Sequence, residues 1–126
     1  MVQPFHSKTA PQAVGPYSHG TICDGLLYLS GQLGLDPKTN QLAPGGVEAQ
    51  ATQALKNLTN ILKEVGADFN QVIQTRLFLV DLADFSKVNA IYAQVLGDAK
   101  PARTTIQAAG LPLGGLVEIE MLIKLP

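Results

Sequence analysis

The feature that most constrains this fold is a strict alternation of side chains near the C-terminal end. From residue 117 to 125 every second residue is apolar: Val117, Ile119, Met121, Ile123 and Leu125. Three of the residues between them, Glu118, Glu120 and Lys124, are charged. Because successive side chains of a strand point to opposite faces, residues 116–125 are predicted to form a β-strand with one wholly apolar face. Such a strand requires a sheet and an apolar layer that covers it.

Two segments with a helical period can supply this layer. The first has apolar residues at three- and four-residue steps and ends at Gly66: Val47, Ala51, Leu55, Leu58, Leu62 and Val65. The second is predicted to begin with Asp84 as its cap and to run through Leu96: Phe85, Val88, Ile91, Tyr92 and Val95. Both stripes predict amphipathic helices that pack on a sheet.

The remaining strands complete the predicted order of elements. Residues 20–23 and 26–30 form a predicted hairpin with Asp24-Gly25 at its turn. Residues 71–80 are rich in β-branched and apolar side chains, and residues 103–107 form a further strand. The order strand, strand, helix, strand, helix, strand, strand indicates an α+β fold with two helices on one face of a sheet. We predict a single domain over residues 1–126.

The second face of the sheet is predicted to be mixed rather than fully solvated. We expect it to carry Arg103, Glu118 and Glu120 beside Leu116 and Leu122. Hydrophobic residues make up 46% of the chain and charged residues only 15%. This charged fraction is low for a protein whose whole surface is exposed to water. Subunits that meet sheet to sheet would explain both observations.

Composition excludes several classes of function. The formal net charge is −1 and the basic residues are scattered, which argues against nucleic acid as a partner. His6, His19 and the single Cys23 have no spacing typical of a zinc site, so we expect no metal. One unpaired cysteine, no apolar leader and no stretch of about 20 apolar residues lead us to expect a cytoplasmic protein.

Arg103 is the residue best suited to bind an anion. It shares a strand face with Thr105 and Gln107, and its guanidinium is a planar fork that matches a carboxylate. The alternative is a structural salt bridge to Glu118 or Glu120 on another strand. The residues alone do not choose between a ligand site and an ion pair.

Other polar residues admit two interpretations each. Glu118 and Glu120 either perform acid–base work or lie at a solvated rim. Tyr17, in the turn Gly15-Pro16-Tyr17-Ser18, either faces a pocket or attaches the loop to the sheet. Asn89, within the stripe of the second helix, either bonds a loop or reaches a pocket.

Several short motifs together resemble the RidA (YjgF-like) family of imine deaminases. They occur in the order and spacing of that family between about Phe5 and Lys124: Gly15-Pro16-Tyr17-Ser18, Ser30-Gly31-Gln32, Asn57-Leu58 with Ile61-Leu62 and Gly66, Val88-Asn89 with Tyr92, Pro101-Ala102-Arg103, and Glu118-Ile119-Glu120. Each motif is weak alone, but six in register are specific.

The resemblance implies a chorismate-mutase-like fold, with a mixed β-sheet and helices on one face. It also implies a homotrimer in which three sheets form a closed central barrel and active sites lie between subunits. The implied reaction is hydrolysis of 2-imino acids, such as 2-iminobutanoate and 2-iminopropanoate, to 2-oxo acids and ammonia. No metal or cofactor is implied.

The resemblance also assigns roles to residues. Arg103 would pair with the substrate carboxylate, assisted by the backbone at Gly31 and Thr105 and by nearby Ser30. Tyr17 would contact the substrate, Glu118 would hold or polarise the attacking water, and Asn89 would shape the site. Two positions depart from the family pattern. Thr105 stands where many members have cysteine, and His19-Gly20 replaces a common Gln-Ala pair.

Two other classes of function remain open at this point. Relatives have been described as translation inhibitors with ribonuclease activity or as stress-linked chaperones. A non-catalytic module that senses 2-oxo acids is the third hypothesis. The Thr105 substitution bears on this choice, because the cysteine it replaces helps to position water in the family.

Overall fold

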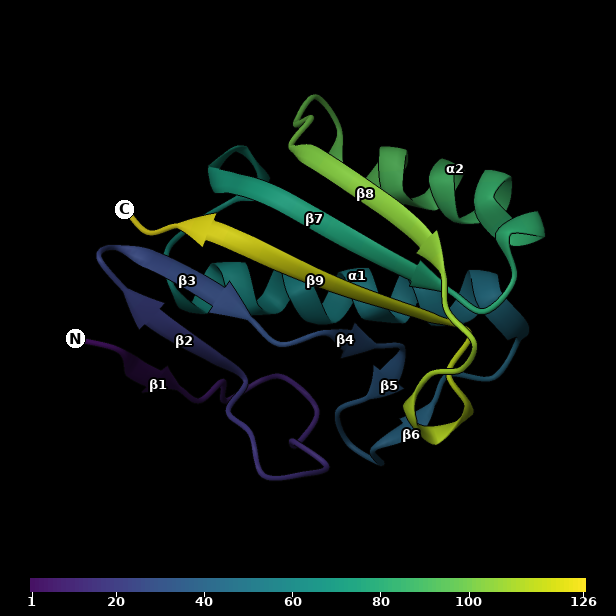
Figure 1. The fold of residues 1–126 in the computed structure, drawn as a ribbon, viewed down its shortest axis with the longest axis horizontal. Coiled ribbons are helices and arrows are strands. Elements are labelled where there is room, and N and C mark those ends of the chain that lie inside the picture. Colours follow the sequence, from purple (N-terminus) through teal and green to yellow (C-terminus); the bar gives the residue numbers. More distant parts are fainter.

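The strand predicted from the alternation lies inside the sheet of the computed structural model, which describes residues 1–126 (Figure 1). The seven-stranded sheet has the order β1–β2–β3–β9–β7–β8, and β4 also pairs with β9. Two further short strands, β5 and β6, pair with each other. The strands are β1 (Gln3–Phe5), β2 (Gly20–Cys23), β3 (Leu26–Leu29), β4 (Gln32–Leu33), β5 (Leu35–Asp36), β6 (Gln41–Leu42), β7 (Val72–Leu79), β8 (Ala102–Gln107) and β9 (Val117–Lys124).

The sheet is mixed, as the family resemblance implied. β7 runs antiparallel to β9 and parallel to β8. A parallel pair needs a crossover connection, and the helix α2 (Phe85–Leu96) provides it. The predicted hairpin between β2 and β3 is confirmed. Asp24 and Gly25 have φ of 52° and 75°, which is the left-handed conformation that a tight hairpin turn requires.

The two predicted helices are also confirmed, with one correction. The helix α1 (Gly46–Glu64) follows the first apolar stripe and α2 follows the second. Asp84 does not cap α2 with its side chain. The Asp81 carboxylate instead accepts a hydrogen bond from the amide of Ala83, 2.9 Å away, and so begins a 3₁₀ turn over Leu82–Asp84 that leads into α2. The side-chain cap therefore lies one turn upstream of its predicted place.

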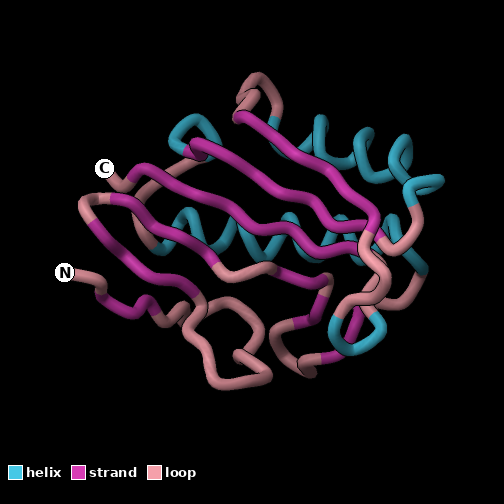
Figure 2. The backbone as a smooth tube through the Cα atoms, viewed as in Figure 1, coloured by secondary structure: helices cyan, strands magenta, loops and turns pink.

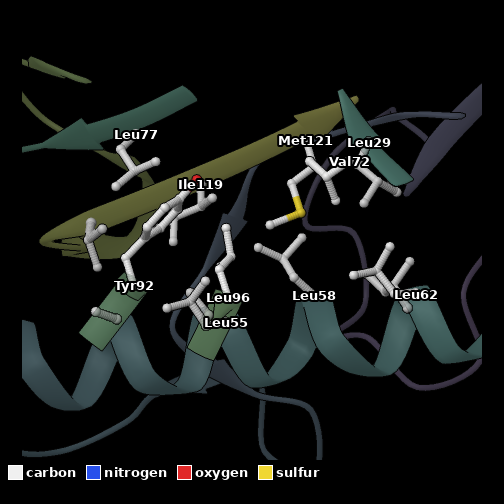
Figure 3. Packing of buried hydrophobic residues seen from close by; sticks show 14 of the residues in the cluster. Leu29, Leu55, Leu58, Leu62, Val72, Leu77, Tyr92, Leu96, Ile119 and Met121 are labelled. Atoms are coloured by element: carbon white, nitrogen blue, oxygen red, sulfur yellow. The ribbon is translucent and has the colours of Figure 1, made fainter. Parts of the chain in front are cut away.

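Both helices pack on the same face of the sheet, as Figure 2 shows in outline. The core lies between α1 and the apolar face of β9, with α2 contributing Val88, Tyr92 and Leu96 (Figure 3). Val117, Ile119, Met121 and Ile123 are all buried, so the predicted apolar face is confirmed. Neither helix has the length and apolarity that a membrane crossing demands.

The opposite face of the sheet carries no helix and is partly apolar. Tyr28 and Ile106 are 48% and 47% exposed there, beside Leu122 on β9. The one ion pair of the structure also lies on this face, where Arg76 Nη1 is 3.2 Å from Glu120 Oε1. The half-apolar second face predicted from the sequence is therefore present. We name it the open face; it consists of the outward side chains of β3, β7, β8 and β9.

Candidate functional site

Arg103 lies on the helix-covered side of the sheet, not on the open face. Along the parallel β7–β8 pair it stands beside Thr75, which is fully buried under the helices. Its guanidinium carbon is 4.9 Å from the ring centre of Tyr92 and 5.4 Å from that of Phe85, both on α2. The expectation that Arg103 shares a face with Glu118 is therefore wrong. Alternation along one strand does not determine its register with another strand of the sheet. It therefore does not determine which side chains of the two strands share a face.

The alternative of an ion pair between Arg103 and Glu118 or Glu120 is also wrong. Glu120 pairs with Arg76, and no carboxylate lies within 4.0 Å of the Arg103 guanidinium. The cation is held by two aromatic rings, an arrangement that is electrostatically favourable and leaves the N–H groups at the edge of the guanidinium free. The Arg103 guanidinium is thus held in position by aromatic rings and has no ion-pair partner within the chain.

The aromatic support beneath Arg103 is fixed by a buried hydrogen bond. The hydroxyls of Tyr92 and Thr75 are 2.8 Å apart, which ties α2 to β7 directly under the guanidinium. Burial raises the pKa of Tyr92, although the Thr75 hydrogen bond and the Arg103 charge oppose this rise. Tyr92 therefore remains a neutral phenol. Sequence reasoning placed both residues in the apolar stripe, and Tyr92 also in a family motif, but it assigned neither a contact with Arg103. No local signal links them to a strand residue 10 to 20 positions away.

The hollow next to Arg103 contains further polar groups. Asn89 lines it, as predicted for a site residue, and so does Lys100, a second cation that sequence reasoning missed. Thr105 is on the same strand face as Arg103, and its Oγ1 atom is inaccessible and has no hydrogen-bond partner. A buried hydroxyl without a partner is costly, which makes Thr105 Oγ1 an unusual atom of this strand. We call Arg103, Asn89 and Thr105 the arginine half-site.

The other predicted residues gather around a second hollow. Tyr17, Gly31 and Glu118 line it, and His19 is among the lining residues. The approach of Gly31 to Glu118 is close: a Cβ at Gly31 would lie 2.7 Å from the carboxyl carbon of Glu118. Any side chain at position 31 would therefore collide with that carboxylate in its present position. We call Tyr17, Gly31 and Glu118 the glutamate half-site.

Glu118 has an altered acidity in this position. Burial is the main cause that raises its pKa, and the neighbouring charge of Glu120 adds to the effect. The carboxyl group therefore holds a proton to higher pH than an ordinary glutamate. Ser30 is placed differently from its predicted role. Its hydroxyl donates to the Ser18 carbonyl oxygen, 2.7 Å away, so it holds the Tyr17 loop rather than pointing free.

Within one chain the two half-sites are separate. Arg103 lies on the helix side of β8, whereas Glu118 belongs to β9, two strands away, and its side chain is on the other face. No group of three or more histidine, cysteine, aspartate or glutamate side chains is placed to hold a metal ion. An unpaired guanidinium on aromatic rings therefore lies at one place, and a carboxyl group with a raised pKa lies at another.

Comparison with known proteins gives these half-sites a context. Residues 7–124 match the family described as "Endoribonuclease L-PSP". The 2-iminobutanoate/2-iminopropanoate deaminase of Mus musculus is 52% identical over 111 residues, which are 88% of this chain and 82% of that protein. The Homo sapiens deaminase of the same name is 49% identical over 111 residues, 88% of this chain and 81% of that protein.

Solved structures agree with the sequence comparison. RidA from the Antarctic bacterium Psychrobacter superposes with a TM-score of 0.91 at 39% identity, covering 98% of this chain and 99% of that one. A structure of E. coli TdcF with bound serine has a TM-score of 0.90 at 30% identity, covering 98% and 99%. The chain therefore belongs to the endoribonuclease L-PSP family, the RidA (YjgF-like) family that its motifs resemble.

Proposed function

We propose that this protein hydrolyses 2-imino acids, with 2-iminobutanoate and 2-iminopropanoate as substrates, to 2-oxo acids and ammonia. The observation that carries the proposal is the unpaired Arg103 guanidinium mounted on Tyr92 and Phe85. Relatives near 50% identity bear the name of this activity, and the serine bound to E. coli TdcF is likewise a small molecule with a carboxylate. On the ground of its lone Cys23 we propose a cytoplasmic location.

Arg103 would bind the substrate carboxylate through two parallel charge-assisted hydrogen bonds. Such bidentate pairs are stronger than neutral hydrogen bonds and fix the orientation of a planar group. Asn89 lines the hollow beside Arg103, and Thr105, whose buried hydroxyl has no partner, lies two residues further along the same strand face. This arrangement would hold the imine carbon at a defined place relative to an attacking water.

Glu118 would serve the hydrolytic step. Water adds to the electrophilic iminium carbon and loses one proton to the carboxylate, which gives a carbinolamine. That proton then passes to the nitrogen, and as the C–N bond breaks the hydroxyl proton returns to the carboxylate, so that ammonia and the 2-oxo acid are released. A glutamate with a raised pKa suits these transfers. Orientation of the two reactants accounts for most of the acceleration, because the iminium carbon is already reactive.

The two half-sites would come together in a homotrimer, the arginine half-site of one subunit facing the glutamate half-site of the next. The separation of Arg103 and Glu118 within one chain supports this assembly, as does the uncovered, partly apolar open face. In the proposed trimer the three open faces form a closed central barrel with the helices outside.

The assembly can be tested with a charge placed on the open face. Leu122→Lys is expected to reduce the mass in solution from three times 13.3 kDa to that of one chain, measured by light scattering after gel filtration. A lysine buried between sheets would lose its hydration without gaining a partner. The matched control is Leu82→Lys, on an exposed turn outside the sheet, which should leave the mass unchanged. A wild type of 13.3 kDa would contradict the trimer.

The activity is tested by coupling to a pyridoxal-phosphate threonine dehydratase, which releases 2-iminobutanoate. The protein is expected to accelerate ammonia release above the spontaneous rate. The outcomes separate the competing functions. Binding of 2-oxobutanoate without acceleration would indicate a sensor, and cleavage of RNA that persists through further purification would favour the activity in the family description.

Gly31→Ala should lower kcat/KM by about ten- to a hundredfold with little loss of thermal stability, because a Cβ here displaces the Glu118 carboxylate and small misplacements of a reacting group are costly. The φ of Gly31 is not positive, so the backbone accepts alanine. Gly110→Ala is the control, since its Cβ would meet nothing within 4 Å. Activity equal to that of the control variant would show that Glu118 need not occupy this position.

A further inference from the structure

The segment between β1 and β2, residues 6–19, carries Tyr17 but belongs to no strand or helix. Within it, the only backbone–backbone hydrogen bond joins the amide of Tyr17 to the Gly15 carbonyl oxygen, 2.9 Å away. The amide of Val14 also donates to the Tyr17 phenol oxygen, at 3.3 Å. These contacts shape the tip of the loop but do not hold it to the body of the protein. The loop is attached to the body of the protein where the Ser30 amide donates to the His19 carbonyl oxygen and by side chains, among them Asn40, whose Oδ1 accepts from the Gln12 amide at 3.1 Å.

His19 ties the end of this loop to its beginning. The amide of Ser7 donates to Nδ1 at 2.9 Å, and Nε2 lies 2.8 Å from the Pro11 carbonyl oxygen. The partners leave no choice of tautomer, because a backbone amide can only donate and a carbonyl oxygen can only accept. Nδ1 must be free of a proton and Nε2 must carry one. The contact as a whole exists only with neutral imidazole.

The backbone of His19 is held as firmly as its ring. The amide of Ser30 donates to the His19 carbonyl oxygen at 2.9 Å, and the Ser30 hydroxyl secures Ser18. The His19 ring is half-buried and lines the same hollow as Tyr17 and Glu118. We call the His19 ring with its two backbone partners, Ser7 and Pro11, the His19 clamp. This clamp is therefore contiguous with the glutamate half-site.

The charged groups around this clamp are few. Glu64 of α1 accepts hydrogen bonds from the Ser7 and Thr9 hydroxyls and, at 2.7 Å, from the Lys8 amide. Partial burial tends to raise the pKa of Glu64, but these bonds outweigh it, so that the pKa is lowered. Glu118, with its raised pKa, faces the hollow from β9. Neither carboxylate is within 4.0 Å of the His19 ring, so no ion pair there favours the imidazolium.

We propose that neutral His19 is the positioning residue that holds the Tyr17 loop over the glutamate half-site, and that protonation of His19 releases it. The proposal rests on the proposed function for its effect on substrate. A proton on Nδ1 would point at the Ser7 amide, placing two donors against each other, so that hydrogen bond is lost. Histidine changes its charge between about pH 5 and 8. Because the closed loop binds only the neutral form, closure is favoured at high pH and lost as pH falls.

The test compares His19→Gln and His19→Ala with wild type. Glutamine also presents one acceptor and one donor group but does not titrate, so it can replace the neutral ring. The most direct readout is hydrogen exchange of the Ser7 amide by NMR, corrected for the intrinsic pH dependence. Between about pH 7.5 and 5.5, protection in wild type should fall by about tenfold, the factor for one net hydrogen bond. Protection should stay constant in His19→Gln and be low at both pH values in His19→Ala.

The exposed His6 provides the matched control. His6→Gln should retain the wild-type pH dependence of Ser7 exchange. Equal pH dependence of Ser7 protection in wild type and His19→Gln would overturn the clamp. Because Glu118 titrates in all of these variants, only the difference between them reports on His19.

A second readout, the affinity for 2-oxobutanoate by calorimetry, tests the link to the site. Affinity should weaken between about pH 7.5 and 5.5 by about tenfold more in wild type than in His19→Gln. If the affinity changes equally with pH in wild type and in His19→Gln while Ser7 exchange behaves as expected, the positioning role of His19 is overturned. Absence of binding at every pH, again with the expected Ser7 exchange, would instead count against the proposed function and leave the clamp supported.

Discussion

Arg103→Ala should lower kcat/KM for 2-iminobutanoate by at least about a hundredfold in the coupled deaminase assay. The substitution removes two charge-assisted hydrogen bonds to the substrate carboxylate, each worth about 1.5–3 kcal/mol. The fold should survive, because Arg103 is only half-buried and has no ion-pair partner within the chain. Gel filtration and circular dichroism would confirm that assembly and secondary structure are intact.

Arg103→Lys distinguishes charge from geometry. Lysine keeps the positive charge but lacks the planar fork, so activity should lie between those of wild type and Arg103→Ala. The stacking on Tyr92 and Phe85 is also weakened, because an ammonium group is a compact point charge. An Arg103→Ala variant with wild-type activity and intact assembly would remove Arg103 from the mechanism.

Leu58→Ala should destabilise the protein by about 2–5 kcal/mol, which is the largest stability effect we expect from a single core truncation. Leu58 is fully buried in the middle of α1, where it packs against the sheet near Met121 and Leu62 (Figure 3). Truncation removes apolar contact and leaves a cavity that rigid neighbours cannot fill. Urea unfolding at fixed protein concentration measures the free energy of unfolding.

Lys56→Ala provides the control, because it makes a surface truncation on the same helix. It should change the free energy of unfolding by less than about 0.5 kcal/mol. A Leu58→Ala variant as stable as this control would mean that α1 does not pack on the sheet as described.

Local patterns predicted most of the elements correctly. The alternation of residues 117–125 located β9 and identified its buried face, and the two apolar stripes located α1 and α2. These predictions succeed because burial imposes the period of each element on its own sequence. The short strands β4, β5 and β6 were not predicted, since two residues are too few to show a period.

The candidate site was predicted in part. Arg103 with Asn89, and Tyr17 with Gly31, do gather as neighbours. The facing of Arg103 was predicted wrongly, because the pattern of β8 shows two faces without showing which one the helices cover. The cap at Asp81 rather than Asp84 is a smaller error of the same origin, since a 3₁₀ turn adds residues that the helical stripe does not reveal.

By itself the sequence determined the α+β order of elements and the buried face of the central strand, and it left Arg103 as either an anion-binding residue or a partner in an ion pair. Only the tertiary structure showed that Tyr92 and Phe85 hold Arg103 on the helix side, that Glu118 lies across the sheet, and that His19 closes the Tyr17 loop. The physical reason is the distance along the sequence over which each kind of information acts. Periodicity records how each segment meets the core, whereas strand register, helix docking and contacts between distant loops depend on how separate segments pack together.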